Sequence, residues 1–269
     1  MRKKIFTDLS KESKKHIELQ DDDKNLLSFL ARNKYIDGAA AKIVLNKKND
    51  RAFLRRIKKL IEYEYIRKKR ITINFAKWGV KQEFITALSL DDAGADIYNI
   101  KKIKTVGVQG EHLRHNLFVR RVCANIERLK QEGFEYETEQ VLDDYNDERI
   151  YIDKTKKYKI RPDIFMQDFA ILIEVELNIK PDRMHYGKRL FWTQYLRNYN
   201  KTVWLVNGQK DKEKLIKIFT NYAGESFKYD PVLDKKMIFT DTVNKNLVVV
   251  FDDFFASPET FLKLWAGLN

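Results

Sequence analysis

Three acidic residues, Asp163, Glu174 and Glu176, have the types and spacing of a divalent metal site. Glu174 and Glu176 alternate with apolar residues in a predicted strand over 169–177, so their side chains lie on one face of it. Asp163 lies on a predicted partner strand over 160–166. Carboxylates that converge in a buried hairpin repel one another unless a hard cation lies between them. We therefore predict that the three side chains bind Mg²⁺ or Mn²⁺.

The same alternation has a simpler explanation. The three carboxylates would follow this pattern equally well as the solvent-facing side of an ordinary edge strand. Spacing alone does not separate the two interpretations.

The acidic residues also carry a family resemblance. Pro162-Asp163, ten further residues and then Glu174-Val175-Glu176 resembles the signature of the PD-(D/E)xK nucleases. The resemblance implies that Asp163 and Glu174 bind a catalytic metal, whereas Glu176 stands where these nucleases usually carry lysine. This departure resembles one branch, the replication-relaxation proteins and MOBC-type conjugative relaxases. Those proteins nick DNA and carry a winged helix before a restriction-endonuclease-like domain.

The resemblance also implies a substitute for the missing lysine. Lys188 lies on a helix predicted over 184–199, directly after the acidic strand. Its side chain would stabilise negative charge on the phosphorane or orient water, although an exposed helix lysine is an equal alternative. His185 and Tyr186 are weaker candidates. The attacking group, water or a side chain, stays open, since Tyr145 and Tyr151 also lie near the site in sequence.

The second half of the chain supplies the elements that would position this site. An amphipathic helix is predicted over 111–130, where His112 and His115 lie three residues apart and are expected to cap or pack rather than bind metal. The remaining predictions are strands over 135–142, 150–152, 201–207, 237–239 and 247–251, and helices over 210–222 and 258–265. This order fits a restriction-endonuclease-like α/β domain over 111–269 with a central mixed sheet, after a linker over 101–110.

The first half is predicted to be a winged helix-turn-helix domain over 1–100. Helices are predicted over 21–32, capped by three aspartates, over 39–45, and after Asn49-Asp50, where Phe53, Leu54 and Ile57 begin an apolar face. A hairpin over 71–75 and 83–88 and a short helix over 91–98 follow. The predicted DNA contacts are Arg51, Arg55, Lys58 and Lys59 on the third helix and Lys68, Lys69, Arg70 and Lys77 on the wing. A protein-interaction module is the alternative.

Charge favours a polyanionic partner for this half. Of the net charge of +13, residues 1–110 hold 26 Lys and Arg against 14 Asp and Glu, or +12. Solvated surface charge is the simpler alternative.

The single cysteine, Cys123, excludes an internal disulfide and a Cys-based zinc site. With no apolar run long enough for a membrane span and a basic start without a signal-peptide core, the sequence predicts a cytoplasmic protein.

Together these features predict an α+β protein that nicks one DNA strand at a plasmid or mobile-element origin, using Mg²⁺ or Mn²⁺. The resemblance adds accessory relaxosome and coupling proteins as partners. The alternative is a DNA-binding regulator or replication-initiation factor with a degenerate nuclease fold, which Glu176 in place of lysine favours. Double-strand cleavage, a third interpretation, needs two active centres and predicts a dimer.

Overall fold

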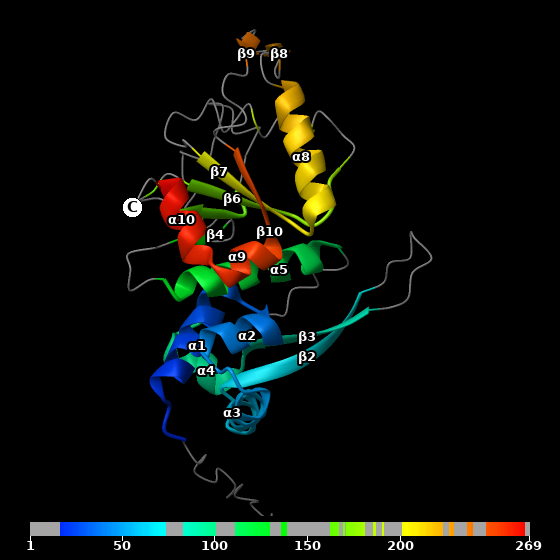
Figure 1. Ribbon diagram of the computed structural model, residues 1–269. Helices are drawn as coiled ribbons and strands as arrows, with labels where there is room; N and C mark the ends of the chain where they lie inside the picture. The colour runs from blue at the N-terminus through cyan, green and yellow to red at the C-terminus, as the bar shows by residue number, and fades with distance from the viewer. Residues whose placement is uncertain are drawn as a thin grey trace, which may run out of the picture. The chain divides into compact units, whose positions relative to one another are not determined.

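The computed structural model describes residues 17–73, 83–100, 111–129, 136–138, 162–166, 169, 171–180, 185–186, 190, 201–222, 226–228, 236–238 and 246–266 (Figure 1). It combines helices with β-sheets, which confirms the predicted α+β class. The chain divides into two compact units, Met1–Gly110 and Glu111–Asn269, and each is described by itself. None of the helices in these ranges has the length and apolar character required to cross a bilayer.

Local capping fixes the helices of the first unit. These are α1 (Asp21–Asn33), α2 (Gly38–Val44), α3 (Asp50–Glu62) and α4 (Asp92–Ile97). Asp37 accepts a hydrogen bond from the Ala40 N–H, and Asn49 accepts one from the Arg51 N–H. The aspartates expected to cap α1 lie inside its first turn instead, where Asp23 accepts a hydrogen bond from the backbone N–H of Gln20.

An antiparallel three-stranded sheet completes the first unit. Its strands β1 (Ile36–Asp37), β2 (Ile66–Ile73) and β3 (Glu83–Leu90) follow the order β1-β3-β2, so β2 has one neighbour. The hairpin begins five residues earlier than predicted, because Ile66 already pairs with Leu90. The two-residue strand β1 was not predicted, since two residues show no alternation.

The second unit is built on a mixed five-stranded sheet of order β10-β7-β6-β5-β4. The strands are β4 (Glu137–Thr138), β5 (Ile164–Met166), β6 (Ile171–Glu176), β7 (Lys201–Val206) and β10 (Asn246–Val250). β6, β7 and β10 run parallel, whereas β4, β5 and β6 pair antiparallel. A separate antiparallel pair joins β8 (Ser226–Lys228) to β9 (Lys236–Ile238).

Helices lie on both sides of this sheet. Figure 1 shows α8 (Gln209–Tyr222) on one side and α5 (Glu111–Glu127) and α9 (Phe251–Ala256) on the other. The helix α10 (Pro258–Ala266) follows α9. The sequence did not predict β8 or α9. The predicted strand over 150–152 and most of the predicted helix over 184–199 lie outside the described residues.

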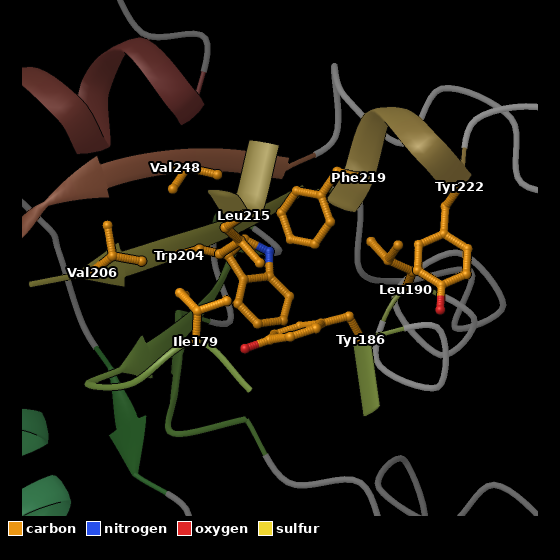
Figure 2. Close-up of a cluster of buried hydrophobic side chains, with 9 residues drawn as sticks. All are labelled: Ile179, Tyr186, Leu190, Trp204, Val206, Leu215, Phe219, Tyr222 and Val248. Carbon is orange, nitrogen blue, oxygen red and sulfur yellow. The ribbon is translucent and has the colours of Figure 1, made fainter. Parts of the chain in front are cut away.

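Trp204 on β7 is the largest side chain of a buried aromatic core on the α8 side (Figure 2). Its ring lies 5.2 Å from that of Phe219 on α8 and 6.0 Å from that of Tyr186. Its indole N–H donates to the Asn246 side chain over 2.8 Å. In the strand register Trp204 is the partner of Glu174, so the acidic face of β6 is directed to the same side as this core.

Candidate functional site

The β5–β6 pair brings the predicted acidic residues to one end of a hairpin. Ile164 pairs with Ile173, so Asp163, one residue before β5, lies at the same end of the hairpin as Glu174. Glu176 lies two residues further along β6 and therefore shares the face of Glu174. All three residues are buried, with exposures of 7%, 5% and 8% for Asp163, Glu174 and Glu176. This burial differs from the solvent-facing edge strand that was the simpler alternative.

Asp163 is held in place by the backbone of β6 and by α5. Its Oδ2 accepts a hydrogen bond of 2.7 Å from the backbone N–H of Val175. The same oxygen lies 3.2 Å from Nε2 of His115. That nitrogen also lies 3.0 Å from the Val175 carbonyl oxygen. Because both neighbours of Nε2 are acceptors, this nitrogen carries a proton.

The environment of His115 keeps its imidazole charged at neutral pH. Burial by itself lowers the pKa of His115, but the hydrogen bond and charge of Asp163 outweigh this and raise the pKa to about 9. The sequence had favoured a capping or packing role for this histidine. Its spacing from His112 carried no information, because the residue that decides its role lies 48 positions away on another element.

Glu176 has a histidine neighbour of its own. His185 Nε2 lies 3.5 Å from Glu176 Oε1 and 3.4 Å from the Lys180 ammonium group. The two outer carboxylates of the predicted set therefore each have a histidine beside them, from different parts of the chain. His185 was expected to be a weaker candidate, and no local pattern pairs it with Glu176.

Tyr186 is placed as a core residue. Its side chain is fully buried, and its hydroxyl oxygen accepts a hydrogen bond of 3.0 Å from the Lys180 N–H. Burial raises the pKa of Tyr186, and the negative charge of Glu176 raises it further. A buried phenol with a raised pKa is a poor nucleophile. Tyr145, Tyr151 and Lys188 lie outside the described residues.

The three carboxylates do not converge as one ligand group. Within the ranges that the structure describes, no set of three or more His, Cys, Asp or Glu side chains is arranged to hold a metal ion. A smaller donor set still suits Mg²⁺, which is commonly bound by one or two carboxylates, waters and substrate phosphates. Asp163 and Glu174 supply such hard oxygen donors on adjacent segments. Asp163 is bonded to the Val175 N–H and lies beside His115 of α5, whereas Glu174 lies on the face of β6 that Trp204 shares, so the described residues do not assemble the predicted site with three carboxylates.

The first unit carries the predicted basic surface. On α3, Phe53, Ile57 and Leu60 face the core, and the predicted DNA contacts Arg51, Arg55, Lys58 and Lys59 are exposed. On β2, Lys68, Lys69 and Arg70 are exposed, and the Arg70 guanidinium lies 3.9 Å from the ring centre of Phe84 on β3. Lys77 lies outside the described residues. The structure thus presents seven of the eight predicted cations at the surface.

Arg56 on α3 forms a largely buried ion pair with Asp23 on α1. Its Nε donates to Asp23 Oδ1 on α1 over 2.7 Å, and its side chain is 15% exposed against 1% for Asp23. No role for Arg56 was predicted from the sequence.

Leu54 differs from its prediction. It was expected on the apolar face of α3, but its side chain is 62% exposed. It follows Phe53 by 100° around the helix, which turns it off the buried stripe.

No family model matches the sequence, and comparison with curated proteins and with solved structures finds no significant match to either.

Proposed function

We propose that this chain is a site- and strand-specific DNA nicking protein, a metal-dependent relaxase. The observation that carries the proposal is the buried acidic end of the β5–β6 hairpin, where Asp163 accepts a hydrogen bond from the Val175 N–H and Glu174 and Glu176 share one face of β6. Burying carboxylates is unfavourable unless cations or hydrogen-bond donors compensate them, so such clusters are more typical of functional sites than of plain cores. Action at a plasmid or mobile-element origin rests on the resemblance to the replication-relaxation proteins.

The arrangement of the first unit supports duplex DNA as the partner. Three helices followed by a β2–β3 hairpin, with cations on α3 and β2, follow the order of a winged helix-turn-helix domain. In such domains one helix enters the major groove, and the hairpin lies along the phosphates. The mixed sheet of the second unit, with an antiparallel acidic hairpin beside parallel strands, supports a restriction-endonuclease-like domain.

The residues of the second unit divide into metal-holding and positioning groups. Asp163 and Glu174 would hold Mg²⁺ or Mn²⁺, which when bound polarises the scissile phosphate and lowers the pKa of a bound water. The Val175 N–H and His115 fix the orientation of the Asp163 carboxylate. The raised pKa of His115 keeps a positive charge beside the Asp163 carboxylate. Because Tyr186 is buried, we favour water as the attacking group over this tyrosine.

Plasmid nicking tests the proposal. The substrate is a supercoiled plasmid carrying the DNA that flanks the gene for this chain, incubated with Mg²⁺ or with EDTA. Wild type should convert it to the open circle only with metal, and Asp163→Asn and Glu174→Gln should each reduce the rate about 100-fold or more. Glu213→Gln, on the exposed face of α8, is the matched control and should nick normally. Equal activity of all four proteins would overturn the proposal.

A second candidate is a DNA-binding regulator or initiation factor with a non-catalytic acidic hairpin. It is favoured by the two hydrogen-bonding groups that already compensate Asp163 and by the lack of a three-residue ligand group among the described residues. Calorimetric titration with Mn²⁺ separates the candidates. Binding that Asp163→Asn abolishes supports the nicking protein, whereas heat of binding absent from both proteins supports the regulator.

A further inference from the structure

One stripe on the outer face of α3 combines three cations with one apolar residue. Arg51, Leu54, Arg55 and Lys58 follow the spacing i, i+3, i+4, i+7, so they form a continuous row along the helix. Leu54 is 62% exposed, more than Phe84, Ile97 and Ile216, the other exposed large apolar side chains in the part of the chain that the structure describes. A single exposed leucine is ordinary on a protein surface. Leu54 has Arg51, Arg55 and Lys58 beside it, with Asp50 one turn before it and Glu62 one turn after Lys58, and this largely basic surrounding is what requires an explanation.

The chemistry of the stripe selects among polyanionic partners. A membrane-binding helix needs a broad apolar face, but Phe53, Ile57 and Leu60 of α3 are directed to the core. Duplex DNA offers phosphates on both edges of the major groove and, inside the groove, the C5-methyl group of thymine. A row of cations around one exposed leucine complements that pattern.

We propose that Leu54 reads a thymine methyl group in the major groove, with Arg51, Arg55 and Lys58 contacting flanking phosphates or guanine. This inference rests on the proposed DNA-binding function and adds a base-reading residue to it. Leu54 is the fifth residue of α3, within the N-terminal half that contacts base edges in helix-turn-helix complexes. Burying one methyl group contributes enough to change affinity by about fourfold.

Replacing thymine by uracil tests the contact, because uracil lacks only the methyl group. Duplexes with a random centre are selected on the full-length wild-type protein, and the best-bound sequence is prepared with thymine or with uracil throughout. Fluorescence anisotropy at one fixed salt concentration then gives both Kd values. Wild type should bind the uracil duplex about fourfold more weakly for each methyl that Leu54 contacts.

The Leu54→Ala variant assigns the effect to this side chain. It should bind both duplexes alike, with the affinity of wild type for the uracil form. Ile97→Ala, an exposed apolar residue on α4, is the control and should keep the wild-type discrimination. Since Leu54 is exposed, the circular dichroism spectrum and Tm of Leu54→Ala should match those of wild type.

Each negative result would contradict a different part of the proposal. Equal affinity of wild type for the thymine and uracil duplexes overturns the role of Leu54, and so does full discrimination by Leu54→Ala, which would reflect DNA shape instead. If wild type binds no duplex in a salt-dependent way, DNA binding itself fails and this inference fails with it. Salt-dependent binding without discrimination removes only the role of Leu54.

Discussion

The exposed row on α3 and the buried acidic end of the β5–β6 hairpin place charge under opposite conditions. Arg51, Arg55 and Lys58 lie in solvent, where ion pairs such as that of Lys58 with Glu62 are weak. Asp163 and Glu176 are buried, each beside a histidine. Exposed charge suits attraction over a distance, whereas buried charge suits a precise local field. The contrast teaches that burial, rather than the number of charged residues, distinguishes the charge of the two units.

The largest expected effect tests Arg56, the cation of α3 that does not follow the exposed pattern. Arg56→Ala should lower the free energy of unfolding by about 3–5 kcal/mol, because it leaves Asp23 buried without its partner. Arg55→Ala, one residue earlier and exposed, should change it by about 0.5 kcal/mol or less. Urea denaturation measures both. Equal stability of the two variants would show that the Arg56–Asp23 ion pair does not stabilise the packing of α3 against α1.

The next effect tests the histidine beside Asp163. The folded-state pKa of His115, about 9, lies above its ordinary value of 6.5, so the stabilisation is complete below pH 6.5 and is lost as the pH rises through 9. In EDTA, wild type should lose on the order of 2 kcal/mol of stability across this window. His115→Gln should show a flatter profile in the same denaturation series. Parallel profiles for the two proteins would show that His115 is not charged by Asp163.

A smaller effect tests whether Tyr186 has a structural role in the core or acts as the attacking group. Tyr186→Phe removes the hydroxyl that accepts a hydrogen bond from the Lys180 N–H, and should cost about 1 kcal/mol of stability. Nicking of supercoiled plasmid by this variant should continue at nearly the wild-type rate. Loss of nicking in a variant that is still folded would instead identify Tyr186 as the attacking group.

The smallest effect concerns the exposed cations of β2. Lys68→Ala and Arg70→Ala should each reduce the slope of log Kd against log salt concentration by about 0.9, because each removes one phosphate contact. Lys217→Ala on α8 changes the net charge by the same amount and should leave the slope unchanged. Equal slopes for wild type and the β2 variants would place the DNA elsewhere.

The sequence by itself determined the local elements of the first unit. Asp37 and Asn49 cap their helices through hydrogen bonds to backbone N–H groups a few residues away, and such contacts need no distant partner. The alternation along β6 likewise set Glu174 and Glu176 on one face. Short elements such as β1 and α9 were missed, since so few residues show no reliable period.

Only the tertiary structure decided which charges would be compensated and how. Asp163 meets His115 across 48 residues, and Arg56 meets Asp23 across 33. These contacts depend on how α5 packs against β6 and α3 against α1, which no local pattern encodes. Tertiary packing also gives Asp163 and Glu176 a histidine each and turns Leu54 outward. The sequence determines which residues are charged. Their burial, which sets the desolvation cost and the pKa of each charged group, is determined only by the folded chain.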